Sequence, residues 1–374
     1  MDLGLNEAQQ MLKTTAQDFL SAECPDTYVR EMEEDERGYT PELWTKIAEQ
    51  GWLGLIIPEQ YGGVELEFQD LVILLEEMGR HMLPGPFFST VVLGGMSIMD
   101  AGSDEQKQEY LPRIAEGQII MTLALTEPSA RWDAAGVELT AKPNGDSYSL
   151  NGTKLFVQNA HVSDYMVVAA RTGNSVEDIS LFIVPTQSDG INQTLLKTIA
   201  SDRQSEVVFN DVEVPSSALL GEENKGWETI RKVMQWGAIG KCAEMSGGGQ
   251  QVLDMTVDYA KQRTQFGRPI GSFQAIQHHC ANMATDVEGS KFITYQAAWR
   301  LSEGLPADRE VAMAKAWVSD AYRRVCALGH QSHGAIGFTK EHNMQLYSRR
   351  AKASEIMFGD TDFHLENVAN IIGL

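Results

Sequence analysis

The sequence is short of basic residues, cysteines and long hydrophobic runs, and each shortage excludes a class of protein. Fifty-two acidic residues outnumber 30 basic ones in the chain of 374 residues, which gives a formal net charge of −22. Because no basic run or basic–aromatic patch interrupts that excess, we expect no nucleic-acid partner. No apolar run approaches the roughly 18 residues that a membrane span needs, so we expect no membrane insertion.

The small number of cysteines excludes a disulfide framework and a zinc site. The four cysteines are widely spaced and form no CxxC pair or other metal-ligand pattern; they are Cys24, Cys242, Cys280 and Cys326. The first seven residues contain no basic region followed by an apolar stretch, so we expect no signal peptide. A reducing, cytoplasmic location and the absence of a bound metal are the expectations that follow.

The hydrophobic period changes twice along the chain and predicts an α+β protein of three domains. Residues 1–120 repeat apolar side chains every three or four positions, which predicts an N-terminal helical domain. Residues 121–225 follow the period of strands and predict a middle antiparallel β-domain. Residues 226–374 return to the helical period and predict a C-terminal four-helix bundle. A hydrophobic content of 43% suffices to fill the interior of domains of this size.

Local patterns predict the individual elements. Thr40-Pro41 has the hydroxyl N-cap and first-turn proline that begin a helix. Asn151-Gly152 is typical of a hairpin turn that leads into a strand. Apolar, β-branched runs predict strands at residues 165–170, 179–185 and 205–215. The predicted helices of the C-terminal part are residues 227–263, 273–301, 310–328 and 343–358.

Three motifs occur in the order and at the separations of one known family. They are Leu125-Thr126-Glu127-Pro128 before the β-rich segment, residues 263–270 (RTQFGRPI) after a long helix, and residues 331–337 (QSHGAIG). Together they make the chain resemble the acyl-CoA dehydrogenases over essentially its whole length. The resemblance implies an oxidoreductase of fatty acid or steroid catabolism. Such an enzyme binds FAD, acts on an acyl-CoA thioester and passes electrons to an electron-transferring flavoprotein.

The resemblance assigns one set of residues to the flavin ring. Thr126, with Leu125 beside it, matches the segment whose backbone and hydroxyl groups hydrogen-bond the pyrimidine edge of the flavin. Phe156 stands where the family places a tryptophan against the flavin. Gln158 replaces the hydroxyl residue expected near the flavin N5 and could still donate a hydrogen bond. The alternative interpretation of the first motif is a plain β-turn around Pro128.

A second set resembles the groups that a neighbouring subunit offers to FAD. Arg263 matches the arginine at the pyrophosphate, and Phe266 the phenylalanine near the adenosine. Gln274 and Gln331 match amides near the adenine and the phosphate chain, and Gly334 a small residue that admits the cofactor. These assignments imply a homo- or hetero-oligomer, with a tetramer as the expected form. The alternative role of Arg263 is a cation favoured at a helix C-terminus.

The chain departs from the family pattern directly after the first motif. Arg131 and Trp132 replace a glycine and a serine, and the serine helps to hold phosphate or acyl-CoA groups in the family. A bulky pair at this point could obstruct the cofactor or build a different pocket. The substrate-binding hypothesis is that Arg131 and Trp132 form part of that pocket, with Arg131 binding an anion.

The catalytic base is the largest departure. Removal of the weakly acidic α-proton of a thioester requires a desolvated carboxylate, and many members supply a glutamate near the C-terminus. That position is Phe358 here, and the position of a second subgroup's glutamate is Gly237. Asp360 and Glu244 are the candidate replacements, with Asp362 a further neighbour. The alternative interpretation of each is a solvated or helix-capping carboxylate.

These departures favour a specialised subunit. The residues resemble most closely the subunits of heteromeric α2β2 dehydrogenases that act on bulky or dicarboxylic acyl-CoAs, in which one subunit type brings the base and its partner completes the flavin site. Two alternatives remain open. One is a flavin-free structural subunit, and the other is a flavin oxidase or monooxygenase on the same fold. His333 and His342 have a spacing that suggests a metal, but no third ligand is evident in the sequence.

Overall fold

The computed structural model describes residues 4–374, so the first three residues of the N-terminal segment considered above lie outside it. The described chain divides into two compact units. The first contains residues up to Arg30, Glu67–Leu83 and Ala238–Leu374, and the second contains Glu31–Leu66 and Pro84–Gly237. Each unit is described by itself.

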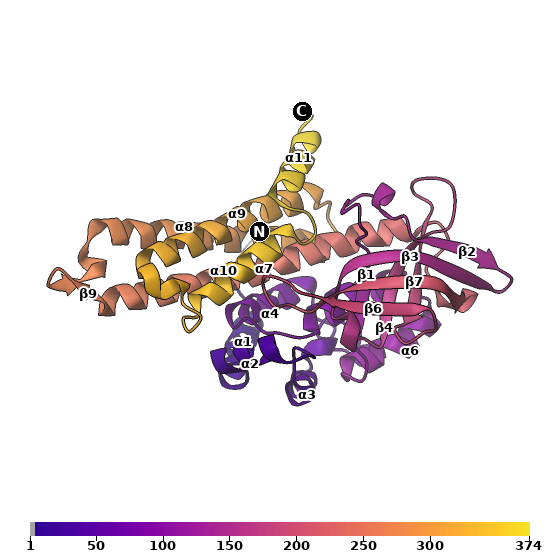
Figure 1. Cartoon of the computed structure of the whole chain (residues 1–374), viewed down its shortest axis with the longest axis horizontal. Helices are drawn as coiled ribbons and strands as arrows, with labels where there is room; N and C mark the ends of the chain where they lie inside the picture. Colours follow the sequence, from indigo (N-terminus) through magenta and orange to yellow (C-terminus); the bar gives the residue numbers. More distant parts are fainter. Residues whose placement is uncertain (1–3) are drawn as a thin grey trace. The chain divides into compact units, whose positions relative to one another are not determined.

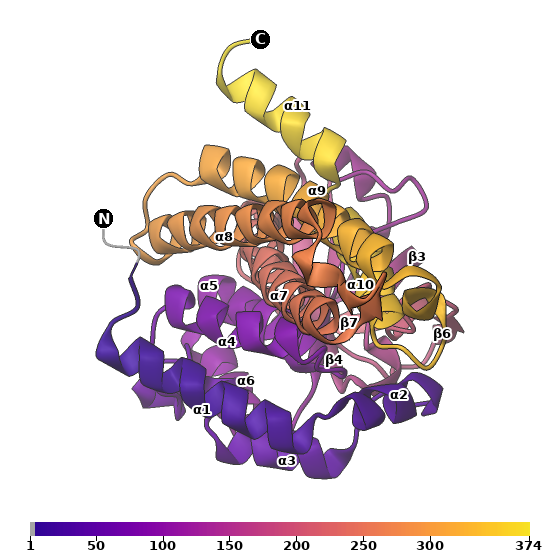
Figure 2. The same cartoon turned by 90° about the vertical axis from the view of Figure 1, so that its left-hand side faces the viewer.

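The first unit is a helical bundle. Its long helices lie side by side around a common apolar interior, and Figure 2 shows several of them nearly end-on. α8 packs against α9, and α9 also packs against α10 and α11. The helices that contribute to this unit are α1 (Glu7–Glu23), α4 (Phe68–Arg80), α7 (Gly226–Gln262), α8 (Gln274–Ser302), α9 (Asp308–His333), α10 (Met344–Ile356) and α11 (Thr361–Ile371).

Glycine allows α7 to cross α4 at backbone contact. A Cβ atom at Gly247 would lie 1.8 Å from the carbonyl oxygen of Glu76, and one at Gly79 would lie 2.1 Å from the carbonyl oxygen of Glu244. Any larger residue at either position would force the two helices apart. The contact places the buried carboxylates of Glu76 and Glu77 inside the bundle, where Lys13 pairs with both of them.

Two features of the bundle differ from the sequence prediction. α9 continues to His333 instead of ending at residue 328, because Gly329 packs against Val252 and Met344 inside the helix and does not end it. A fifth helix, α11, follows α10 and leads away from it towards the C-terminus (Figure 1). The sequence prediction ended its last helix at residue 358 and assigned no helix after Asp360, although capping was one interpretation of that residue.

The second unit is built on one eight-stranded sheet, whose strands are drawn as arrows in Figure 1. Seven strands follow the order β6-β7-β3-β2-β4-β5-β8, and β1 pairs with β4 in parallel register. Most other pairings are antiparallel, with a single parallel pair between β2 and β4. The strands are β1 (Met121–Ala124), β2 (Thr140–Asn144), β3 (Ser147–Gln158), β4 (Tyr165–Arg171), β5 (Ile179–Pro185), β6 (Ile191–Leu196), β7 (Gln204–Pro215) and β8 (Leu219–Leu220).

The predicted hairpin turn at Asn151-Gly152 is wrong. Both residues lie inside β3, where the register with β7 shifts between Leu150 and Gly152. Gly152 has a φ of 148° and packs so closely that a Cβ there would lie 2.8 Å from Leu139. The glycine therefore serves a β-bulge, and the turn lies instead at Gly145, with a φ of 61°, between β2 and β3.

Short helices complete the second unit. Thr40 accepts a hydrogen bond from the backbone N–H of Leu43 and Pro41 occupies the first turn of α3, so the predicted helix start is confirmed. The apolar side of the sheet is buried by residues such as Leu150, Phe182 and Phe209. The helices that belong wholly to this unit are α3 (Pro41–Glu49), α5 (Met96–Ala101) and α6 (Asp104–Ala115), and α2 (Asp26–Glu34) joins the two units.

Candidate functional site

The three residues that follow β1, Leu125 to Glu127, have their carbonyl groups occupied from within the β-domain. The side chain of Lys154 donates to the carbonyl oxygen of Leu125 at 3.1 Å, and the backbone N–H of Leu155 donates to that of Thr126 at 2.8 Å. Ala130 closes a turn by donating its N–H to the carbonyl of Glu127 at 2.8 Å. The turn around Pro128 therefore exists, and it is one part of a more extensively bonded loop.

A buried ion pair holds this loop to β3. The ammonium group of Lys154 lies 2.6 Å from Oε1 of Glu127, and the two side chains are 0% and 3% exposed. The Glu127 carboxylate also accepts hydrogen bonds from the backbone N–H groups of Glu138 and Leu139. Burial lowers the pKa of Lys154 to about 8, against the opposing effect of Glu127. The pair is therefore a desolvated charge interaction with strict geometry.

The same segment offers hydrogen-bond donors and no free acceptor on its backbone. Within residues 4–374, neither the backbone N–H groups of Leu125 and Thr126 nor the Thr126 hydroxyl has a hydrogen-bond partner. Thr126 is only partly buried, so its donors are accessible to a ligand. A group with several acceptor atoms along one edge would satisfy them.

A second β-bulge aims the neighbouring side chains of β3. The register with β7 shifts between Lys154 and Val157, so both of those side chains point into the core although they are three residues apart. Phe156 lies in the bulge with a φ of 56° and is 51% exposed. Gln158 follows at the end of the strand and is half-buried. A backbone strained in this way at an exposed aromatic ring is typical of functional sites.

The two residues proposed for substrate binding lie on the outer side of this loop. The guanidinium of Arg131 forms a bidentate pair with Asp133, at 3.0 Å and 2.5 Å, and both side chains are more than half exposed. The pKa of Arg131 is raised by its hydrogen bond to Asp133. Trp132 is half-buried. An anion at Arg131 would therefore compete with the intramolecular pair, and the substrate role of both residues stays a prediction.

A second group of predicted residues gathers at one end of the bundle. Arg263 follows α7, Gln274 begins α8, and Gln331 and Gly334 end α9. The ring of Tyr259, near the end of α7, stacks on that of His333 at 4.5 Å, which shows that the ends of α7 and α9 lie together. A short ribbon of β9 (Thr264–Gln265) and β10 (Arg268–Pro269) projects from the same end (Figure 1).

These side chains are presented to the outside of the chain. Phe266, at the tip of the ribbon, is 93% exposed and has a φ of 51°. The side chains of Arg263, Gln274 and Gln331 are exposed and make no hydrogen bond or ion pair within residues 4–374. Gly334 has a φ of 68°, and a Cβ there would meet no atom within 4 Å. The structure thus brings the predicted phosphate and adenosine groups together on an open surface.

Phe358, the predicted position of the family's catalytic glutamate, lies in a loop between two helices. Phe358 is 5% exposed and has a φ of 57°. Lys315, which is 0% exposed, donates to the carbonyl oxygens of Glu355 at 2.8 Å and Gly359 at 2.9 Å. The ring N–H of His364 at Nε2 donates to the carbonyl oxygen of Phe358 at 2.9 Å. The loop from Glu355 to Gly359 is therefore fixed from two helices.

Burial controls the charge of both anchoring groups. It lowers the pKa of Lys315 to about 8, while Cys242 and Glu355 act in the opposite direction. It also lowers the pKa of His364 to about 4, and the nearby Lys315 adds to the effect. His364 is therefore neutral at pH 7, as its donation to a carbonyl through a single ring N–H requires.

The candidate replacement carboxylates have other partners. Asp360 is exposed and caps α11 by accepting a hydrogen bond from the backbone N–H of Phe363 at 2.9 Å. Glu244 pairs with Lys241 at 2.7 Å on the same helix. Asp362 is exposed in the first turn of α11. Gly237, the second expected glutamate position, is buried in α7 and contributes no side chain. The capping alternative describes the position of Asp360 well, and its catalytic role stays a prediction.

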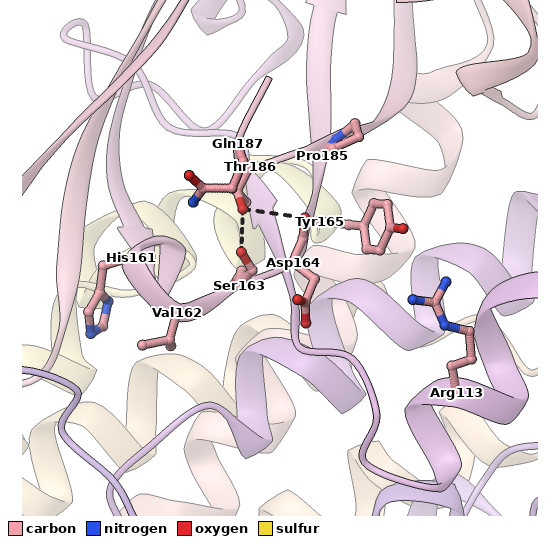
Figure 3. Close-up of a pocket in the computed structure, with 9 residues that line it drawn as sticks. All are labelled: Arg113, His161, Val162, Ser163, Asp164, Tyr165, Pro185, Thr186 and Gln187. Carbon is pink, nitrogen blue, oxygen red and sulfur yellow. Dashed lines mark hydrogen bonds between the residues drawn. The ribbon is translucent and has the colours of Figure 1, made fainter. Parts of the chain in front are cut away.

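A cavity of about 340 Å³ in the β-domain unit contains none of the residues predicted from the sequence (Figure 3). The guanidinium of Arg113 lies 5.6 Å from the centre of the Tyr165 ring at its wall. Thr186 donates to the carbonyl oxygens of Ser163 and Asp164, which closes the opposite wall. The polar wall is already bonded to the protein itself, so the cavity indicates no particular ligand.

No arrangement of three or more His, Cys, Asp or Glu side chains in residues 4–374 is suited to a metal ion. The Nδ1–H of His333 donates to the Gly329 carbonyl, and Nδ1 of His342 accepts a hydrogen bond from the backbone N–H of Met344. These histidines are therefore used in packing and hydrogen bonding within the bundle. In the same part of the chain, no helix combines the length and hydrophobicity of a membrane span.

Family models cover most of the chain. The N-terminal domain of the acyl-CoA dehydrogenases matches residues 6–118, the middle domain residues 122–212, and the C-terminal domain residues 224–373. The chain belongs to the acyl-CoA dehydrogenase family. One relative is a 3-(aryl)acrylate reductase from Clostridium sporogenes. It is 33% identical to this chain, and the match covers 95% of this chain and 96% of the relative.

Solved structures agree with this membership. Butyryl-CoA dehydrogenase from Megasphaera elsdenii superposes with a TM-score of 0.93 at 30% identity, over 100% of both chains. A chain of the ChsE4–ChsE5 complex from Mycobacterium tuberculosis gives 0.92 at 29% identity, over 100% of this chain and 99% of that one. The predicted α+β fold of the family and its oxidoreductase class are confirmed.

FAD is the cofactor of the acyl-CoA dehydrogenase family, and the residues present here fit it. The donors of Leu125 and Thr126 suit the acceptor-rich pyrimidine edge of a flavin, and the accessible guanidinium of Arg263 suits a pyrophosphate. A side chain at position 334 would occupy the open space that the glycine leaves for the cofactor. The particular residue assignments stay predictions.

Sequence reasoning missed three buried residues that shape these segments: Lys154, Lys315 and His364. It placed Glu127 beside Thr126 but did not predict its buried ion pair. The three missed residues occur in a strand or helix, where a polar residue is usually interpreted as solvent-exposed. An inward position within an apolar stretch, such as that of Lys315 in Ala314-Lys315-Ala316, was the available indication.

Proposed function

We propose that this chain is an FAD-binding subunit of an acyl-CoA dehydrogenase assembly, and that a partner subunit supplies the carboxylate base. In this reaction FAD supplies the acceptor for the hydride that leaves the β-carbon of the acyl-CoA. An electron-transferring flavoprotein is the proposed final electron acceptor. The tetrameric form of the family is the proposed form of the assembly.

The observation that carries the proposal is the contrast between intact flavin-side groups and an absent base. Phe358 and Gly237 occupy both positions where family members carry the glutamate. The nearby carboxylates of Asp360 and Glu244 are used as a helix cap and an ion pair. The donors at Thr126 and the accessible groups at Arg263 and Phe266 support continued binding of FAD.

The likeness to the ChsE4–ChsE5 complex supports the heteromeric form of the proposal. That complex is named as an assembly of two different proteins, and one of its chains resembles this one over its whole length. In a two-subunit site, Arg263, Phe266 and Gln331 would bind the FAD of the neighbouring chain. If the neighbouring subunit carried the catalytic glutamate, the assembly would keep its activity although this chain has no base of its own.

The flavin-to-chain ratio of the purified protein tests the proposal. We expect a ratio well below one when the chain is expressed alone, and restoration on co-expression with a glutamate-bearing homologue from the same organism. The restored complex should reduce an artificial electron acceptor when an acyl-CoA is added. A chain with full flavin occupancy and acyl-CoA turnover by itself would contradict the heteromeric form.

The same experiment separates the two alternative functions. Absence of flavin and of activity in every assembly would indicate a structural subunit. Oxygen uptake with substrate, without reduction of the artificial acceptor, would indicate an oxidase or monooxygenase. The relation to a 3-(aryl)acrylate reductase makes the reverse reaction worth measuring, with an α,β-unsaturated thioester as the substrate.

A further inference from the structure

We propose that Lys154 and Glu127 are positioning residues that hold the Leu125–Thr126 backbone as a donor-only edge for the flavin. This inference rests on the proposed function, because it requires that FAD binds at this segment. Neither residue needs to contact the cofactor. Both act through the loop after β1, because Lys154 bonds the Leu125 carbonyl and Glu127 holds Lys154 in place.

The first step is the distribution of hydrogen bonds along the segment. The carbonyl of Leu125 accepts from Lys154 Nζ, that of Thr126 from the Leu155 N–H, and that of Glu127 from the Ala130 N–H. The N–H groups of Leu125 and Thr126 have no partner within residues 4–374. In a trans peptide the carbonyl of one residue and the N–H of the next residue point in opposite directions, so the inward Leu125 carbonyl turns the Thr126 N–H outward. The Leu125 N–H belongs to the preceding peptide, which β1 holds at Ala124.

The second step explains why a lysine is needed. β1 ends at Ala124, so no strand is available to bond the carbonyl of Leu125. A lysine side chain can reach it and still donate to a carboxylate, since the ammonium group carries three donors. Glu127 fixes the direction of that ammonium group and is itself fixed by the N–H groups of Glu138 and Leu139.

The third step explains how the lysine reaches the interior. The bulge between Lys154 and Val157 turns both side chains inward and leaves Phe156 exposed between them. One irregularity of β3 therefore presents an aromatic face and buries the anchor of the donor edge. Phe156 and the Leu125–Thr126 segment are the two flavin-side features predicted from the sequence. The position of both depends on this bulge, because it directs Lys154 inward.

Loss of the lysine should alter flavin binding in addition to lowering stability, because it also leaves the Glu127 carboxylate unpaired. With Lys154→Met, the carbonyl of Leu125 loses its buried donor and the peptide unit is free to rotate. The N–H of Thr126, which belongs to that peptide unit, would then no longer be held towards the flavin. Weaker donation to the pyrimidine edge should also make the reduction potential more negative, because these donors stabilise the charge gained on reduction.

The test compares three variants of the FAD-containing assembly. Lys154→Met should weaken FAD binding at least about 10-fold and make the potential more negative. Lys154→Gln keeps a donor for the Leu125 carbonyl without the charge and should restore affinity to within about threefold. The control is Leu150→Ala, a fully buried change in the same strand that should lower the melting temperature but leave both FAD affinity and potential unchanged.

The outcomes distinguish this inference from the proposed function. Wild-type affinity and potential in Lys154→Met would overturn the inference alone. Equal losses in the methionine and glutamine variants would also overturn it, because the donor to Leu125 would then be irrelevant. A wild-type chain that binds no FAD in any assembly would overturn the proposed function, and the inference with it. If Lys154→Met does not fold, the glutamine variant and Glu127→Gln measured against Leu150→Ala decide the question.

Discussion

Two loops of this chain are each held by a buried lysine, and they differ in what balances its charge. In the β-domain, Lys154 bonds the carbonyl of Leu125 and forms an ion pair with Glu127 at 2.6 Å. In the bundle, Lys315 bonds two carbonyl oxygens and the hydroxyl of Ser319 at 3.2 Å, all of them neutral acceptors. Both side chains are 0% exposed, and burial lowers both pKa values to about 8.

The difference shows two ways of fixing a backbone segment inside a protein. The ion pair fixes its loop rigidly but does not tolerate substitution, because removal of either partner leaves a buried charge without compensation. The carbonyl set is more tolerant, because backbone dipoles stabilise the ammonium group without adding a second charge to be desolvated. The first loop contains the residues predicted for the flavin side. The second contains Phe358 at the position where the sequence comparison with the family predicts a glutamate.

The largest expected effect comes from breaking the ion pair. Glu127→Ala should lower the free energy of unfolding by about 3–5 kcal/mol, because it leaves the Lys154 ammonium buried and unpaired. Urea denaturation of the variant measures this loss. The double variant Glu127→Ala with Lys154→Met should recover part of the stability, since it removes the unpaired charge. A single variant within about 1 kcal/mol of wild type would show that water or another group replaces the carboxylate.

Acidification should weaken the second loop through His364. Its pKa falls from the ordinary value of 6.5 to about 4 in the folded chain, so the unfolded chain binds more protons between these values. Stability is therefore complete above about pH 6.5 and decreases as the pH falls towards 4, by up to about 3 kcal/mol. Unfolding curves at several pH values measure the slope. His364→Gln should flatten it, and an unchanged slope would exclude His364 as the source.

A glutamate at position 358 should be able to function as the base, because Lys315 and His364 fix the backbone of the second loop. Phe358→Glu, in an assembly whose partner glutamate has been changed to glutamine, should raise acyl-CoA-dependent flavin reduction about 100-fold, since a positioned base contributes 10²–10⁴. Phe358→Gln is the control for shape without a carboxylate. Equal rates in the two variants would mean that the loop no longer aims its side chain at substrate.

The smallest expected effect is the loss of the second lysine. Lys315→Met should cost about 1–3 kcal/mol of unfolding free energy, because two buried carbonyls lose their donor while a desolvated charge is also removed. Urea denaturation of Lys315→Met and Glu127→Ala compares their losses of unfolding free energy. A smaller loss in Lys315→Met would show that a lysine held by neutral acceptors tolerates substitution better than a buried ion pair. A loss above that of Glu127→Ala would reverse the comparison.

The sequence predicted the fold where a pattern is local. Period, caps and β-branched runs gave the predicted limits of β5, at residues 179–185, and the start of α3 at Thr40. Asn151-Gly152 misled because the same dipeptide suits a hairpin and a bulge, and the choice depends on the pairing of β3 with β7. The fifth helix was missed although capping was one interpretation of Asp360, because the predicted helices ended at residue 358 and no helix was assigned after that cap.

The sequence by itself determined the family, the flavin motifs and the absence of a glutamate at positions 237 and 358, because these depend on which side chain stands at which position. Only the tertiary structure decided how the loops are anchored. Glu127 and Lys154 are 27 residues apart, and Lys315 and Gly359 are 44 apart. A lysine is ordinarily a solvent-exposed residue, and it becomes a buried anchor only when folding brings acceptors to it and excludes water.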